Sequence, residues 1–169
     1  MTDVTAVPSL DISRFLGRWY EICRLPMKSE DETATDITAN YSLNEDGTVR
    51  IDNRCFDETG KPSQAIGEEG PVDDAKSRLK VTFLPEFVRW LPFTDADYWV
   101  LKIDPDYRIA LVGTPDQKYL WVLARAPHVI RETLDECLSE AGRQGFDLTY
   151  LITPRNTDRE ETDALLEEA

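Results

Sequence analysis

The stretch Gly17-Arg18-Trp19-Tyr20-Glu21-Ile22-Cys23-Arg24-Leu25 decides the fold class, because here an N-terminal lead-in turns into a first strand. A glycine directly before an alternating, tryptophan-led segment allows a tight backbone turn while the large indole enters a core. That combination suits the closed end of a small barrel. With Trp19 inward, the two-residue period of a strand turns Glu21 and Cys23 inward as well. Arg24 then points outward.

The chain beyond this stretch consists of short alternating apolar runs separated by turn residues, followed by one helical pattern. From His128 to Gly145 the apolar residues recur with a helical period, and Pro127 precedes that segment. These elements favour an all-β barrel or sandwich with one helix near the C-terminus. The runs predict further strands at residues 37–43, 49–56, 63–69, 77–84, 98–103, 107–113, 119–125 and, as a short last strand, 146–152.

Composition and charge limit the classes of function. The 169 residues are 41% hydrophobic without a compositional break, which predicts one domain with one core. A net charge of -14 argues against nucleic acid as a partner, since phosphate neutralisation needs clustered Lys and Arg. Three cysteines without CxxC spacing and a single histidine support neither a zinc site nor a thioredoxin-like motif. We therefore expect no metal and no cofactor.

The two ends of the chain differ in character from its middle. Residues 1–14 are expected to form a leader, residues 15–156 the folded domain, and residues 157–169 an acidic, flexible tail. The first residues lack the basic region and the apolar run of a secretory signal. The sequence as written therefore predicts a cytoplasmic protein. The alternative, if an export signal has been removed, is the periplasm or the outer membrane.

Three segments together carry a family resemblance: the stretch from Gly17 to Leu25, Asp104-Pro105-Asp106-Tyr107-Arg108, and Leu120-Trp121-Val122-Leu123-Ala124-Arg125-Ala126-Pro127. The chain resembles the lipocalin family over residues 15–156, and within it the bacterial and apolipoprotein-D-like branch. The resemblance implies an eight-stranded, up-and-down antiparallel barrel with the helix packed outside and a short ninth strand. It also implies a structural signature at the closed end, in which the Arg125 guanidinium lies over the Trp19 indole. The signature residues are Gly17, Trp19, Asp106, Tyr107 and Arg125.

The resemblance further implies that the barrel binds and carries a small lipophilic ligand of the fatty acid or lysophospholipid class, in membrane or envelope lipid maintenance. Strand periodicity gives a largely apolar inward face with a few hydroxyl and amide groups, which suits an acyl tail with a polar head near the mouth. Gly67 and Ala110 share that face. The expected ligand-binding residues are Cys23, Ala39, Tyr41, Ile51, Asn53, Cys55, Val81, Phe83, Trp99, Leu101, Val112, Tyr119 and Trp121.

Two other functions are weighed against a carrier: a lipid- or isoprenoid-modifying enzyme, and an interaction module. The inward thiols of Cys23 and Cys55 have no base nearby, so we do not expect an enzyme. We interpret Glu21 as structural, accepting hydrogen bonds from Arg125, Arg108 or a tyrosine.

The interaction module rests on the loop between Pro85 and Phe93, which is apolar for a loop. Its aromatic residues Phe87, Trp90 and Phe93 would form a lid, contact a membrane transiently or pair with a second copy. The oligomeric state is left open between a monomer and a homodimer.

Overall fold

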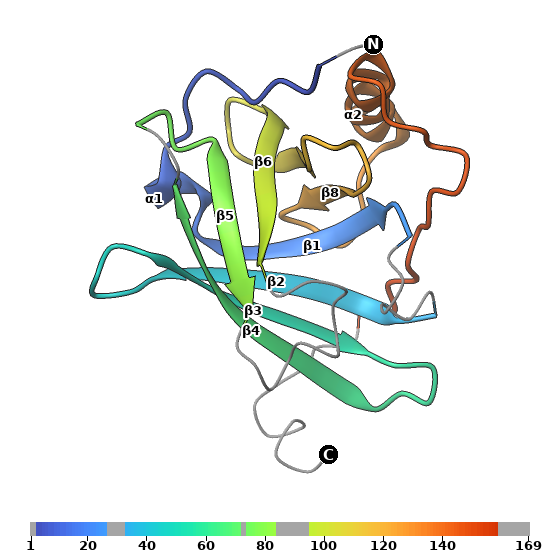
Figure 1. The fold of residues 1–169 in the computed structure, drawn as a ribbon. Coiled ribbons are helices and arrows are strands. Elements are labelled where there is room, and N and C mark those ends of the chain that lie inside the picture. Colours follow the sequence, from blue (N-terminus) through green and yellow to red (C-terminus); the bar gives the residue numbers. More distant parts are fainter. Residues whose placement is uncertain (1–2, 27–32, 72–73, 84–94, 159–169) are drawn as a thin grey trace.

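The computed structural model describes residues 3–26, 33–71, 74–83 and 95–158. Eight strands pair antiparallel with their neighbours in sequence, and the first also pairs with the last, so the sheet closes into a barrel (Figure 1). This confirms the predicted up-and-down barrel. The strands are β1 (Gly17–Arg24), β2 (Thr35–Leu43), β3 (Val49–Phe56), β4 (Pro62–Pro71), β5 (Arg78–Phe83), β6 (Asp95–Ile103), β7 (Ile109–Gly113) and β8 (Leu120–Ala124).

One end of the barrel is closed by α1 (Ile12–Phe15), which directly precedes the first strand. Asp11 caps this short helix, since its carboxylate accepts hydrogen bonds from the Ser13 amide and hydroxyl at 3.1 and 2.6 Å. Leu10 and Phe15 are buried and belong to the same apolar cluster as the barrel interior. The chain therefore fills this end with side chains before β1 begins.

The second helix, α2 (Arg131–Arg143), lies outside the barrel wall (Figure 1). Its buried residues Cys137 and Ala141 pack in one cluster with outward residues of β1, β7 and β8. The helix begins three residues later than predicted, because Ile130 has an extended backbone with ψ of 147°. It ends at Arg143 with Gln144 as its C-cap, and Gly145 follows with φ of +90°, a conformation that favours glycine.

The predicted ninth strand at residues 146–152 is wrong: only Ile152 pairs, with Arg24 of β1, through two backbone hydrogen bonds of 2.8 and 2.9 Å. The segment turns instead, since the Asp147 carboxylate accepts the Thr149 amide at 3.0 Å. Phe146 is buried in the cluster beneath α2. The apolar residues of segment 146–152 therefore pack in the contact between α2 and the barrel and do not form a strand.

The described part of the leader is hydrogen-bonded to the rest of the domain. The Thr5 amide donates to the side-chain oxygen of Gln144 at 2.8 Å, and the Val7 amide donates to the Val100 carbonyl at 2.9 Å. The Leu10 amide donates to the Ala75 carbonyl at 2.8 Å. These contacts lie on the helix side and at the closed end. The loop with Phe87, Trp90 and Phe93 and the tail from residue 159 lie outside the described residues.

A β-bulge in β1 breaks the strict alternation assumed for that strand. Glu21 lies opposite Leu123 and Cys23 lies opposite Val122, so one extra residue stands between them. Ile22 and Cys23 consequently both pack in the outer cluster under α2. Arg24, expected outside, is fully buried and lies opposite Trp121.

A second bulge, in β6, has the same effect. The pairing shifts between Val100, opposite Val112, and Lys102, opposite Leu111. Tyr98 and Val100 therefore pack with the interior cluster, whereas Trp99 and Leu101 pack in the outer cluster. This reverses the inward assignment made for Trp99 and Leu101.

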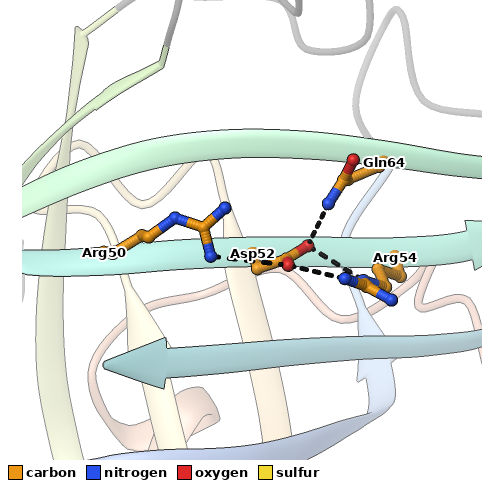
Figure 2. A network of polar contacts seen from close by, with 4 residues as sticks. All are labelled: Arg50, Asp52, Arg54 and Gln64. Atoms are coloured by element: carbon orange, nitrogen blue, oxygen red, sulfur yellow. Dashed lines mark hydrogen bonds and ion pairs between the residues drawn. The ribbon is translucent and has the colours of Figure 1, made fainter. Parts of the chain in front are cut away.

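A polar network ties β3 to β4 (Figure 2). Arg54 donates to both Asp52 carboxylate oxygens at 3.1 and 2.9 Å, and the Gln64 amide of β4 donates to Asp52 at 3.0 Å. Arg50 forms a longer ion pair with the same carboxylate, at 3.7 Å. Asp52 alternates with the interior residue Ile51, so these charges occupy the opposite face of the sheet from the barrel interior.

Candidate functional site

The barrel interior brings together about half of the expected ligand-binding residues. The buried residues of the interior cluster are mostly aliphatic, and four partly buried aromatic residues, Tyr98, Tyr107, Tyr119 and Trp121, pack against them. Asn53 lies opposite Ala39 and Ala65, which places it on the same face. The expected residues found in this cluster are Ala39, Tyr41, Ile51, Val81, Val112, Tyr119 and Trp121.

Four expected residues are not part of this interior group. Cys23, Trp99 and Leu101 lie on the outer side of the wall, in the cluster under α2. Cys55 belongs to a small separate cluster with Ala34 and Ile37, near the start of β2. The Phe83 side chain lies outside the described part of the structure, so its role stays a prediction.

Aromatic rings from β2, β6 and β8 meet in the interior. The Tyr41 and Tyr98 hydroxyls are hydrogen-bonded at 2.6 Å, and the Tyr98 ring stacks on Trp121 with centroids 6.2 Å apart. Tyr119 stacks on the same indole at 6.4 Å. Tyr98 is a functional candidate that the sequence missed, because the bulge in β6 reverses its direction. These rings offer a continuous apolar surface with one polar point, the tyrosine pair.

The interior also contains a buried ion pair. The Arg24 guanidinium donates to the Glu21 carboxylate at 2.9 Å, and both side chains are almost fully excluded from solvent. Burial raises the pKa of Glu21, and the charge of Arg24 opposes that effect. The expected partners of Glu21, namely Arg125, Arg108 or a tyrosine, are therefore wrong. The bulge in β1 turns Arg24 inward and supplies the nearer cation.

A second buried carboxyl, Glu69 of β4, was not among the expected site residues. It is 1% exposed and lies opposite the interior residues Val49 and Val81, so it shares their face. Neither carboxyl oxygen has a hydrogen-bond partner among the described residues. Burial raises the pKa of Glu69 to about 8. The sequence did hold a signal: Gly67 was assigned inward, and the two-residue period carries Glu69 to the same face.

The closed end carries the implied signature. The Arg125 guanidinium lies 3.8 Å from the centroid of the Trp19 ring and donates to the backbone carbonyls of Tyr107, Arg18 and Arg14 at 2.8–3.0 Å. The Trp19 indole N–H donates to the Phe15 carbonyl at 2.8 Å. All three hydrogen bonds of Arg125 therefore go to backbone carbonyls of this chain. The arrangement is therefore structural in character.

The turn between β6 and β7 supports this end of the barrel. The Asp104 carboxylate accepts the amides of Arg108 and Ile109, the latter at 2.8 Å. Tyr107 adopts φ of +55°, and its hydroxyl accepts the Asp11 amide at 3.0 Å. Asp104 thus holds the turn, whereas the predicted signature residue Asp106 is exposed.

The thiols have surroundings that suppress their reactivity. Burial raises the pKa of Cys23 to about 12 and that of Cys137 to about 11. A thiol with such a pKa stays protonated at neutral pH and is a poor nucleophile. Within the described residues, no group of three or more His, Cys, Asp or Glu side chains is arranged to hold a metal ion.

Comparison with known proteins decides the family. A family model described as a lipocalin-like domain matches residues 10–156. The chain belongs to the lipocalin family. It is 35% identical to temperature-induced lipocalin-1 of Arabidopsis thaliana, over 92% of this chain and 84% of that protein. It is 36% identical to the outer membrane lipoprotein Blc of Escherichia coli, over 88% and 81%.

Other similarities extend the same conclusion. The lipocalin is 33% identical to apolipoprotein D of Macaca fascicularis, over 75% of this chain and 67% of that protein. Two solved structures show the same fold at low identity. Apocrustacyanin C1 has a TM-score of 0.70 at 10% identity, covering 94% of this chain and 85% of its own. Lobster apocrustacyanin A1 has a TM-score of 0.67 at 11% identity, covering 91% of each chain.

Proposed function

We propose that this lipocalin binds and carries a small single-chain lipid, of the fatty acid or lysophospholipid class, inside its barrel. Lipocalins bind small hydrophobic ligands and are generally binding and transport proteins. The observation that carries the proposal is the interior cluster, which combines aliphatic residues with the stacked rings of Tyr98, Tyr119 and Trp121. An apolar interior with few polar groups suits an acyl chain.

Small side chains support the same proposal. Ala39, Ala65 and Ala110 all belong to the interior cluster, on three different strands. A short side chain occupies little of the space enclosed by an eight-stranded barrel, and barrels of this size hold one small ligand in lipocalins. The proposed ligand is therefore a single chain.

We place the proposed role in the maintenance of membrane or envelope lipids. The Escherichia coli relative is named an outer membrane lipoprotein, and this favours the periplasm or outer membrane over the cytoplasmic location expected from the sequence. Among the described residues, no helix has the length and apolar character to cross a membrane. Membrane contact through Phe87, Trp90 and Phe93 remains a prediction of the sequence. Fractionation of the source cells, with and without a carbonate wash, tests the location.

Lipid extraction tests the binding proposal directly. The protein is purified without detergent, and native mass spectrometry compares its mass before and after extraction with organic solvent. We expect one bound lipid per barrel, lost on extraction and identified as a fatty acid or a lysophospholipid. A barrel that carries no lipid and, once refolded, takes up neither class would contradict the proposed function.

A further inference from the structure

The charges inside the barrel do not balance, and this imbalance bears on the ligand. Arg24 is already paired with Glu21 at 2.9 Å. Glu69 is as deeply buried, yet its carboxyl oxygens have no hydrogen-bond partner among the described residues. A buried polar group without a partner costs free energy, so such groups are normally satisfied in the functional state. The carboxyl keeps at least one hydrogen-bond acceptor in either protonation state, so a group that donates a hydrogen bond can satisfy it.

Glu69 faces the same barrel interior as the tyrosine pair, since it lies opposite Val49 and Val81 of the cluster that contains both tyrosines. Burial first, and then the Glu69 charge, raises the pKa of the Tyr41 hydroxyl, and the same charge acts on Tyr98. The Tyr41 and Tyr98 hydroxyls already bond to each other at 2.6 Å. Together the three side chains add polar groups to a mostly aliphatic and aromatic interior, separate from the Glu21–Arg24 pair.

We propose that Glu69, which shares the barrel interior with the Tyr41–Tyr98 pair, binds the head group of the carried lipid, and that it selects head groups that donate a hydrogen bond, amines and alcohols, over carboxylates. This inference rests on the proposed function and narrows the proposed ligands away from fatty acids, whose head group is a carboxylate.

Charge balance in the interior predicts the order of binding affinity among lipid head groups. An ammonium group would favour release of the Glu69 proton to solvent and would form a neutral pair with the carboxylate. An alcohol would donate to the carboxyl oxygen without adding charge. A carboxylate would share a proton with Glu69 and leave a negative charge in the interior, where the cation of Arg24 is already balanced by Glu21. The net charge of -14 on the whole chain also disfavours an anionic ligand and favours a cationic one.

A matched set of ligands tests the proposal. Dodecylamine, dodecanol and dodecanoate share one chain and differ in the head group, and each is titrated into delipidated protein to displace the neutral fluorophore N-phenyl-1-naphthylamine. We expect the amine and the alcohol each to bind about tenfold or more tightly than dodecanoate, the difference that one hydrogen bond to a charged group supplies. Equal affinities for all three would overturn the proposal.

Variants of Glu69 separate its role from that of the apolar wall. Glu69→Gln removes the charge but keeps an acceptor, so the preference for the amine should disappear while the alcohol still binds. Glu69→Leu should remove both preferences. Glu68→Gln is the matched control, because Glu68 is the exposed neighbour on the same strand, and it should behave as the parent protein does. Unchanged selectivity in both Glu69 variants would overturn the proposal.

The outcomes distinguish this inference from the function on which it rests. If the fluorophore and all three ligands fail to bind folded, delipidated protein, the proposed function fails and the inference fails with it. If they bind without regard to head group, only the inference fails. Circular dichroism confirms the fold of each variant, and the selectivity of the parent protein tests the proposal even if a variant does not fold.

Discussion

Replacing Glu69 with Gln should change how the stability of the protein depends on pH. Burial raises the pKa of this carboxyl from 4.5 to about 8. Between these values the folded chain holds a proton that the unfolded chain has released, so the free energy of unfolding falls as the pH rises. The fall is about 1.4 kcal/mol per pH unit, or about 5 kcal/mol across the whole window. Below pH 4.5 and above about pH 8 Glu69 contributes no slope.

Glu69→Gln abolishes this titration and keeps the shape of the side chain. Urea unfolding, followed by tryptophan fluorescence at pH 5 and pH 8, gives the free energy of unfolding for each protein. From pH 5 to pH 8, the free energy of unfolding of the variant should rise by about 4 kcal/mol relative to that of the parent.

Comparison with the parent and with a control variant removes other contributions to this difference. Glu21, which also titrates in the interior, is present in both proteins and cancels in the comparison. Glu68→Gln should show the parent's profile, because Glu68 is exposed. Parallel pH profiles for the parent and Glu69→Gln would refute the reasoning and show that Glu69 is hydrated in the folded protein.

Three further predictions concern the closed end and the thiols. Arg125→Ala should lower the free energy of unfolding, measured by chemical denaturation, by about 1–3 kcal/mol, because the contact with Trp19 and three hydrogen bonds are lost. Ligand titration should show an unchanged affinity of the folded protein. Gly17→Ala should cost about 1–3 kcal/mol in the same assay, because Gly17 has φ of +100° and an added Cβ would lie 3.3 Å from the Arg125 guanidinium; an unchanged midpoint would refute the strain. Cys23 and Cys137 should resist a disulfide reagent at pH 8 until the protein unfolds, because their pKa values of about 12 and about 11 keep the thiols protonated; rapid labelling of the native protein would contradict this.

The sequence predicts the barrel well because strands and turns are specified by residues that are close together in the chain. Alternating runs and turn residues locate all eight strands, and the three family segments bring Trp19, Tyr107 and Arg125 together at one end. The closed end is determined by short-range backbone geometry and one stacked pair. Such features are visible in the order of residue types along the chain.

The site was predicted less completely, because alternation is counted from one residue and a bulge shifts every residue beyond it. One extra residue in β1 moved Cys23 outward and Arg24 inward, and one in β6 exchanged Trp99 for Tyr98. No feature of the local composition marks either bulge. Glu69 was missed for another reason: its charge argued for solvent, although the period of the strand pointed inward.

The central claim is that a lipid occupies the barrel interior, and two tryptophans on opposite sides of the wall test it. Trp121 packs with the interior cluster, whereas Trp99 packs in the outer one. Bromododecanol and bromododecanoate quench tryptophan only near contact, so either ligand reports where it binds. Saturable quenching in the micromolar range or tighter, about -8 kcal/mol, should largely disappear in Trp121→Phe and persist in Trp99→Phe. Quenching that survives Trp121→Phe and disappears in Trp99→Phe, or no saturable quenching of the folded, delipidated protein by either ligand, would contradict the account.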